Sequence, residues 1–286
     1  MSNPYLAHAK RILRLRTQGE TLPLGGLVPP RRRQPGKRAP RVCIFSPHPD
    51  DECIIGGLAL RLQRELRYRV VNVAVTQGSR PERQAGRWKE LTEACAYLGF
   101  ELLPTAPGGL NGVNLSTKQN DPTRWSAMVD TIADLLATQQ PRLVFVPHDQ
   151  DWNSTHIGTH HLVLDALGRL PAFECLVVET EFWGAMSAPN LMVELDVRHL
   201  ADLMAALSFH VGEVKRNPYH LTLPAWMQDN VRRGGELVGG QGGAAPSFSF
   251  ATLYRLRRWT GHELAPLYAG GRMISIHENL RGLLRG

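Results

Sequence analysis

Short apolar runs alternate along the chain with longer segments in which apolar residues recur at helical spacing. The short runs are rich in β-branched residues and predict buried strands at 42–45, 70–76, 101–103, 143–147 and 174–179. The helical spacing predicts helices over 57–68, 83–98, 122–138, 157–170 and 197–209. Strands that alternate with helices pair as a mainly parallel sheet. The pattern therefore predicts an α/β, Rossmann-like fold with helices on both faces of the sheet.

The alternation weakens in the C-terminal third of the chain. Residues 218–233 predict a further helix, residues 234–246 predict a glycine-rich flexible loop, and residues 248–257 fit neither pattern. We expect a single domain over 41–286 with an irregular C-terminal third. Residues 1–40 form a basic N-terminal extension in this interpretation, with a short helix over 4–16 followed by a linker of Gly, Pro and Arg.

The formal net charge of +7 is concentrated in short runs. Residues 31–33 with 37–38 make one basic run, and Arg255, Arg257 and Arg258 make a second. Such runs can meet nucleic acid, anionic lipid or an acidic substrate, although a short basic stretch is more often a solvated linker. No aromatic residue interleaves the first run, so we expect no specific nucleic-acid partner. The sequence leaves open whether the protein forms a homo-oligomer.

The remaining composition points to a reducing compartment. No apolar stretch is long enough to span a bilayer, and the N-terminal residues lack the apolar core of a signal peptide. The four cysteines form no CxxC pair and lie in apolar surroundings, at positions 43, 53, 95 and 175. We interpret them as reduced, buried thiols of a cytoplasmic protein rather than as a structural zinc cluster.

The polar motif Ser46-Pro47-His48-Pro49-Asp50-Asp51-Glu52 follows directly after the first predicted strand. In an open α/β sheet, ligands bind just past the carboxyl ends of the strands. Proline on both sides of His48 stiffens the backbone, which suits a site that must hold ligands still. A solvated acidic turn with a capping aspartate is the alternative interpretation of this motif.

A second polar cluster, His148 to His156, follows the strand predicted at 143–147 and therefore occupies the same topological position. Neighbouring parallel strands place their end loops side by side. We expect His48, Asp51 and one later histidine to form a set of two imidazoles and one carboxylate, which leaves positions open as in catalytic zinc sites. His156 is preferred over His160 and His161 because it lies nearest the strand end. Fe²⁺ or another divalent transition metal would fit the same set.

The motif His48-Pro49-Asp50-Asp51-Glu52, followed by Gly56-Gly57, resembles the signature of the PIG-L/LmbE family of zinc-dependent de-N-acetylases. Thr76-Gln77-Gly78 is similar to a Thr-x-Gly that follows a strand in that family. The resemblance spans roughly 41–210. It implies that His48, Asp51 and His156 are zinc ligands and that Asp50 is the general base.

Where the family usually has the first histidine of a His-Pro-Asp-His motif, this chain has Asn153. The oxyanion and proton-donor roles of that histidine are therefore open between Asn153 and His210, which resembles a late histidine of the family. The resemblance implies a hydrolase that removes an acetyl group from an N-acetylated amino sugar of the N-acetylglucosamine type, giving acetate and a free amine.

Arg80 and Arg87, past the second strand, are candidate contacts for an anionic or hydroxyl-rich part of that substrate, since Arg forms bidentate pairs with phosphate or carboxylate. Two other functions stay open. A metal-dependent phosphohydrolase could use the paired aspartates with Mg²⁺, although that metal prefers more carboxylates and fewer histidines. A non-catalytic basic binding protein on the same fold is the second.

Overall fold

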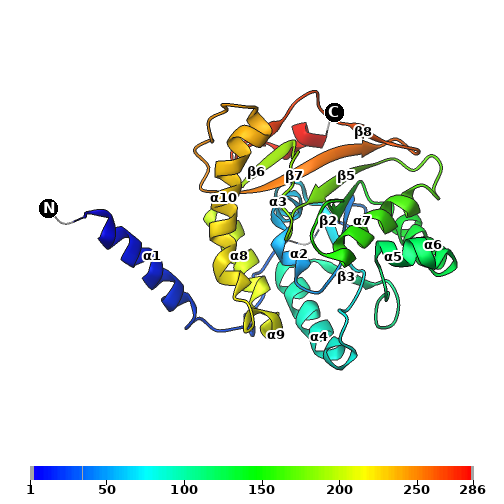
Figure 1. The fold of residues 1–286 in the computed structure, drawn as a ribbon, viewed down its shortest axis with the longest axis horizontal. Coiled ribbons are helices and arrows are strands. Elements are labelled where there is room, and N and C mark those ends of the chain that lie inside the picture. Colours follow the sequence, from blue (N-terminus) through cyan, green and yellow to red (C-terminus); the bar gives the residue numbers. More distant parts are fainter. Residues whose placement is uncertain (1–2, 34, 285–286) are drawn as a thin grey trace.

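A computed structural model describes residues 3–33 and 35–284 of the chain. The described residues form a nine-stranded sheet in the order β3-β2-β1-β4-β5-β7-β6-β9, with β8 paired to β7 (Figure 1). The strands are β1 (Arg41–Ser46), β2 (Arg69–Ala74), β3 (Glu101–Pro104), β4 (Leu143–Pro147), β5 (Cys175–Thr180), β6 (Leu191–Leu195), β7 (Phe250–Trp259), β8 (Leu264–Pro266) and β9 (Arg272–Ile274). All five predicted strands are confirmed, and they pair in parallel with one another.

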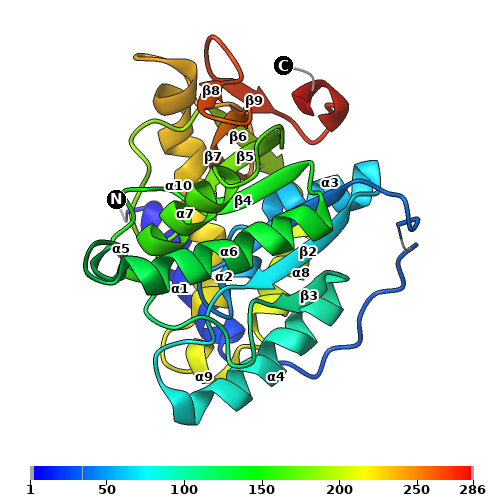
Figure 2. The ribbon, with the colours of Figure 1, turned by 90° about the vertical axis from the view of Figure 1, so that its right-hand side faces the viewer.

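Helices cover both faces of the sheet, as the alternation predicts (Figure 2). Successive residues of β1 point to opposite faces of the sheet: Ile44 joins one buried cluster and Phe45 the other. The first cluster takes in α2 (Asp51–Ile54), α3 (Gly57–Leu66), α4 (Pro81–Leu98), α8 (Val197–Leu207) and α10 (Tyr219–Gly239). The second takes in α6 (Pro122–Gln139) and α7 (Ser154–Leu167). The fold is thus mixed α/β around a central, mostly parallel sheet.

Three segments differ from the expectations for the irregular regions. The segment between the strand predicted at 101–103 and the helix predicted at 122–138 contains the helix α5 (Leu115–Asn120), and the segment 248–257 becomes the long strand β7. The strand β6 was not expected at all. β7 runs antiparallel to β5 and β6 and lies between them, so the C-terminal third completes the sheet.

The glycine-rich segment after residue 233 is partly helical, because α10 continues to Gly239. The reason is close packing. A Cβ added at Gly234 would lie 2.3 Å from Met192 Cε, so glycine lets the helix approach β6 closely. The prediction of a loop over 234–246 is therefore wrong for its first half.

A buried carboxylate fastens β7 to β5. Glu179 has no exposed surface, and its two oxygens accept four hydrogen bonds of 2.6–2.8 Å from Arg255 and Arg257. Arg255 also donates to Asp149 at 2.8 Å. Two arginines of the second basic run are therefore paired within the fold.

The N-terminal segment begins with α1 (Tyr5–Gly19), which projects from the body of the molecule (Figure 1). Residues 20–40 connect it to β1. The remaining short helices are α9 (Val211–Val214) and the 3-10 helix η1 (Leu280–Leu284). Among the described residues, no helix has the length and apolar character to cross a membrane.

Candidate metal centre and active-site cavity

The loop after β1 is held in an unusual backbone conformation. Asp50 has φ 111°, a region that side-chain-bearing residues rarely adopt. Three hydrogen bonds fix this loop: Asp50 N–H donates to Glu52 Oε2 at 3.0 Å, Arg87 Nη2 donates to the Pro49 carbonyl at 2.7 Å, and Thr76 Oγ1 donates to the Pro47 carbonyl at 2.7 Å. Strands β1 and β2 and helix α4 therefore act together to aim the motif.

The two loops that follow β1 and β4 bring His48, Asp51 and His156 together. His48 Nδ1 lies 3.2 Å from His156 Nε2, His156 Nε2 lies 3.4 Å from Asp51 Oδ2, and His48 Nδ1 lies 3.5 Å from Asp51 Oδ2. Tetrahedral zinc, with bonds of about 2.0–2.2 Å, separates its ligand atoms by roughly 3.3–3.6 Å. The three donor atoms thus have the spacing of one face of a metal tetrahedron.

Hydrogen bonds orient these side chains. The His48 backbone N–H donates to Asp51 Oδ2 at 2.8 Å. His156 Nδ1 lies 3.5 Å from Asp151 Oδ1, and the second oxygen of Asp151 accepts the N–H groups of Trp183 and Gly184. A carboxylate behind a metal-binding imidazole fixes its tautomer and raises its basicity.

The local charges favour a cation. Burial alone would lower the pKa of His156, but Asp51 and Asp151 outweigh it and raise that pKa to about 9. Burial would likewise raise the pKa of Asp51, yet the facing His156 and His48 hold it below its usual range. Carboxylates that attract a proton onto a buried imidazole would also attract a divalent metal.

His148, and the two histidines that follow His156 in α7, have partners elsewhere. His148 Nε2 lies 2.8 Å from the Gly184 carbonyl, and His160 Nδ1 lies 2.9 Å from the Pro147 carbonyl. His161 packs edge-on against His160. Of the three histidines that the sequence left open, His156 is the one that converges with His48.

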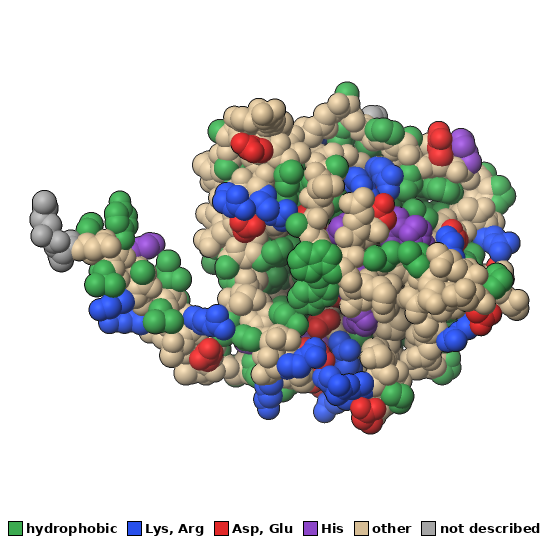
Figure 3. Space-filling view, in the orientation of Figure 1, with side chains coloured by type: hydrophobic (Ala, Val, Ile, Leu, Met, Phe, Trp, Pro, Cys, Tyr) green, Lys and Arg blue, Asp and Glu red, His purple; other side chains and the backbone are tan. Residues whose placement is uncertain are grey.

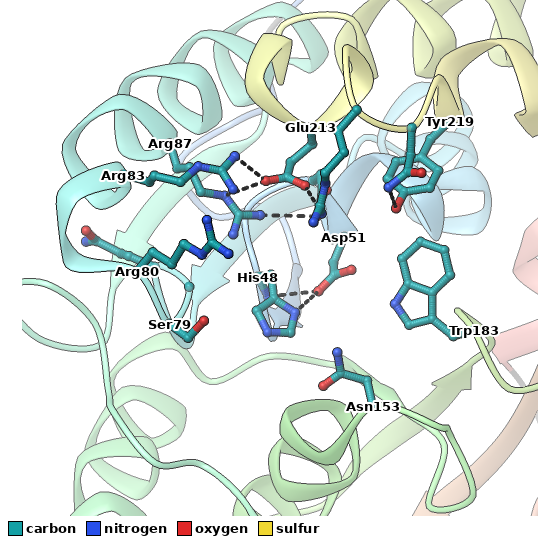
Figure 4. Close-up of a pocket in the computed structure, with 15 residues that line it drawn as sticks. His48, Asp51, Ser79, Arg80, Arg83, Arg87, Asn153, Trp183, Glu213 and Tyr219 are labelled. Carbon is teal, nitrogen blue, oxygen red and sulfur yellow. Dashed lines mark hydrogen bonds and ion pairs between the residues drawn. The ribbon is translucent and has the colours of Figure 1, made fainter.

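A cavity of about 540 Å³ opens in front of the three donor atoms (Figure 4). His48, Asp50 and Asp51 line it, and so does Asn153, which caps the N-terminus of α7. Asn153 Oδ1 caps the helix by accepting the Thr155 N–H at 2.8 Å. The three-donor set is thus open toward a space that can hold a substrate.

Asp50 differs from its neighbour Asp51. Burial, and then the charge of Asp51, raise the pKa of Asp50 well above its usual range. Arg87 lies 3.8 Å from its carboxylate, which partly offsets these effects. Two adjacent carboxyl groups with pKa values moved in opposite directions are typical of acid–base sites.

Arginines dominate one wall of the cavity. The wall contains Arg80, Arg83 and Arg87 from the start of α4, and Arg216 from the segment that follows α9. Glu213 binds Arg83 at 2.6 Å and also pairs with Arg216, whereas Arg80 makes no ion pair within the described residues. The cavity therefore has a cationic wall with at least one arginine free to bind a ligand.

The sequence reasoning missed several cavity residues. Arg83 follows Arg80 by three positions and precedes Arg87 by four, so helical spacing alone places all three on one face. The rings of Trp183 and Tyr219 lie 5.1 Å apart, and both residues line the cavity. Trp183 comes from an irregular segment that carries no periodic signal, whereas Tyr219 begins the predicted helix α10, whose position relative to the cavity the local pattern does not give.

His210 is buried beside Glu52. It has no exposed surface, its Nε2 lies 2.8 Å from Glu52 Oε1, and its Nδ1 has no partner among the described residues. It does not line the cavity. Its partner Glu52 in turn accepts a hydrogen bond from the Asp50 backbone N–H.

Comparison with known proteins agrees with this geometry. The family model described as PIG-L, GlcNAc-PI de-N-acetylase, matches residues 43–167, which contain His48, Asp50, Asp51 and His156. No curated protein matches the chain.

Solved structures share the fold at low identity. A conserved protein from Thermus thermophilus is 19% identical with a TM-score of 0.55, covering 75% of this chain and 93% of that one. The N,N'-diacetylchitobiose deacetylase from Pyrococcus horikoshii is 17% identical with a TM-score of 0.54, covering 91% and 94%. The 4-carboxy-2-hydroxymuconate hydratase from Pseudomonas putida is 18% identical with a TM-score of 0.54, covering 76% and 95%.

A hydratase among these structures means that the fold alone does not fix the reaction. The assignment depends instead on the sequence match, which covers β1 to α7, the segment that supplies the three converging donor atoms and Asp50. Through this segment the chain is similar to the PIG-L, or GlcNAc-PI de-N-acetylase, family.

Proposed function

We propose that this protein is a metal-dependent hydrolase that removes the acetyl group from an N-acetylated amino sugar and releases acetate and a free amine. The observation that carries the proposal is the triangle of His48, Asp51 and His156 donor atoms next to an open cavity, which His48, Asp51 and the neighbouring Asp50 line. The family description and the deacetylase among the structural neighbours support the same reaction.

His48, Asp51 and His156 would hold the metal, and we propose Zn²⁺. Two imidazoles and one carboxylate also suit Fe²⁺, so the metal content needs direct measurement. When bound in such a site, the cation acidifies water and polarises a carbonyl group. The spacing of the three donor atoms and the carboxylate behind His156 fit this use.

Asp50 is the proposed general base. Its carboxyl faces the cavity, and a pKa raised by burial and by Asp51 brings its proton affinity closer to that of a base working near neutral pH. After accepting a proton from the attacking water, Asp50 could deliver it to the departing amine nitrogen. Arg87 limits the rise in the pKa of Asp50 through its positive charge.

Asn153 is the proposed residue for the oxyanion role of the histidine that the family usually carries. Because Asn153 Oδ1 is used by the α7 cap, its Nδ2 group remains as a hydrogen-bond donor toward the acetyl oxygen. His210 is buried behind Glu52 and acts as a positioning residue for Asp50.

The cavity wall suggests how the rest of the substrate is held. Arg80 is the proposed contact for an anionic or hydroxyl-rich group attached to the sugar, since it lines the cavity without an ion-pair partner in the described chain. Arg87 also lines the cavity, but its bond to the Pro49 carbonyl gives it a structural task as well. The four free, buried cysteines support a reducing, cytoplasmic setting.

The test is acetate release from a panel of N-acetylated amino sugar conjugates by protein of measured zinc content. Asp50→Asn should lower kcat about 10²–10⁴-fold with unchanged zinc content, as expected for loss of a general base. Asp149→Asn is the matched control, because Asp149 lies near the site yet pairs with Arg255 outside the cavity. Fully zinc-loaded protein that releases acetate from no member of the panel would contradict the proposal.

The arginine-rich wall also gives some support to a metal-dependent phosphohydrolase, because arginine binds phosphate in bidentate fashion. Phosphate release that requires Mg²⁺ and is indifferent to zinc would favour that function. Failure of both assays would leave a non-catalytic basic binding protein.

A further inference from the structure

Helix α1 leaves a continuous apolar face uncovered. Four of its larger apolar side chains, Tyr5, Leu6, Ile12 and Leu13, are 74%, 54%, 58% and 65% exposed. Their spacing of i, i+1, i+7 and i+8 places them on one stripe of the helix, with Ala9 between them and Arg16 at its C-terminal end. Leu15, 67% exposed, lies beside this stripe. Figure 3 shows green side chains along the outside of this helix. Apolar patches of this kind on a protein surface mark an interaction site.

The helix meets the body at its C-terminal end. A Cβ added at Gly19 would lie 2.6 Å from Leu221 Cδ2, so the last turn of α1 sits directly against α10. The following chain is held by the Gly25 N–H, which donates to Ser208 Oγ at 3.3 Å. The preceding turns project away from the body (Figures 1 and 3).

The opposite face of α1 is basic. Lys10, Arg11 and Arg14 follow Ala7 by three, four and seven positions and so lie on one stripe, and the sequence of α1 contains no acidic residue. The helix therefore separates an apolar stripe from a cationic one.

The charge of the whole chain is concentrated around this helix. Residues 1–38 contain nine Lys and Arg and one Glu, a net charge of +8. The chain as a whole has 33 basic and 26 acidic residues, so residues 39–286 have 24 and 25, a net charge of −1. The positive charge of this protein therefore belongs to the extension and not to the domain that holds the cavity.

We propose that α1 binds the surface of an anionic lipid bilayer. The apolar stripe would enter the boundary between headgroups and acyl chains, and the basic stripe would face the phosphates. A helix with an apolar face, a Lys/Arg-rich polar face and low net hydrophobicity lies in the interface plane instead of spanning the bilayer.

Two other occupants explain the observations less well. Nucleic acid would use the basic stripe but leave the apolar side chains in water. A second copy of this chain could cover the apolar stripe, but it offers no opposite charge, because the extension is itself positive and the remainder is nearly neutral. An anionic bilayer satisfies both stripes at once.

The experiment is sedimentation of the full chain with vesicles of phosphatidylcholine, pure or with about 30% phosphatidylglycerol. We expect the partition coefficient to rise with the anionic fraction and to fall with added salt. Neutralising a basic residue, as in Arg14→Gln, should weaken binding to the anionic vesicles about fivefold, since each Lys or Arg near such a surface contributes about that factor.

A matched pair of variants separates insertion of the apolar stripe from simple charge attraction. Ala7→Asp and Leu13→Asp change the charge equally, but Ala7 lies on the basic stripe and Leu13 on the apolar one. We expect Leu13→Asp to weaken binding about tenfold or more beyond the effect of Ala7→Asp, from the lost burial of one leucine. Both variants should unfold at the temperature of the parent protein, because both side chains are exposed.

Three results would overturn the proposal. Equal loss for the two variants would show attraction without insertion. No sedimentation with anionic vesicles at low salt would exclude the bilayer. A dimer in lipid-free buffer that Leu13→Asp converts to a monomer would assign the apolar stripe to a second copy of the chain.

Discussion

Glu52 is the residue whose replacement tests the architecture behind the site most directly. Its side chain is fully buried, one oxygen lies 2.8 Å from His210 Nε2, and the other accepts the Asp50 N–H at 3.0 Å. Cys53 Sγ adds a contact at 3.0 Å. Glu52→Ala would remove the partner of a buried imidazole and of a strained backbone amide together.

The expected cost follows from these contacts. Removing one member of a buried, hydrogen-bonded ion pair costs about 3–5 kcal/mol, because the remaining charge stays buried without compensation. Glu52→Gln keeps the shape and one acceptor oxygen, so it should cost about 1.5–3 kcal/mol, the contribution of a hydrogen bond to a charged group.

Urea unfolding of the metal-free proteins, followed by tryptophan fluorescence, measures both values. The order of stability should be wild type, then Glu52→Gln, then Glu52→Ala, with similar denaturant slopes. A Glu52→Ala variant that loses less than about 1 kcal/mol would refute the reasoning, because a buried pair cannot be broken so cheaply unless His210 is neutral and solvated.

Three further predictions concern charge, metal and thiols. Burial would lower the pKa of His210, but Glu52 and Asp50 outweigh it, so the pKa of His210 in the folded protein is raised. The stability that the His210–Glu52 pair contributes should be complete below about pH 6.5 and should decline as the pH rises through the folded pKa. Wild type and Glu52→Gln should therefore differ less in urea unfolding at pH 9 than at pH 6. Zinc should raise the midpoint of thermal unfolding of the wild type and leave His48→Ala nearly unchanged, and an equal rise in both would place the ion elsewhere. The native protein should resist alkylation by a thiol reagent at pH 8 and react fully in denaturant, because burial raises the pKa of every one of its four cysteines, Cys43, Cys53, Cys95 and Cys175; rapid reaction of the native protein would contradict this.

The parallel half of the fold follows from local pattern. Strands β1, β2, β4 and β5 are short, buried apolar runs, and each is separated from the next by turn or helix residues, so periodicity and length identify them. The local pattern does not identify β6 and β7. β7 mixes buried residues with Arg255 and Arg257, which are tolerated there because Glu179 compensates them from the neighbouring strand. Such a partner lies 76–78 residues away in sequence and leaves no local trace.

Some residues of the candidate site could likewise be predicted from the sequence, and others could not. His48, Asp51 and His156 follow strand ends, and strand order in a parallel sheet brings strand ends together, so their convergence could be predicted. The position of His210 behind Glu52 could not, because it depends on how the irregular segment after α8 folds back over α2. Trp183 lies in an irregular segment too, whereas Tyr219 begins the predicted helix α10 and its place at the cavity depends on how that helix packs.

The backbone angle of Asp50 has a consequence for protein engineering. A residue other than glycine at φ 111° stores about 1–3 kcal/mol of strain, and its carboxyl is buried beside Asp51. Asp50→Gly would relieve both penalties, so libraries screened for heat resistance alone should enrich glycine at this position. Any programme that seeks a hardier version of this protein must therefore score turnover in every round, or it will select the loss of the proposed general base.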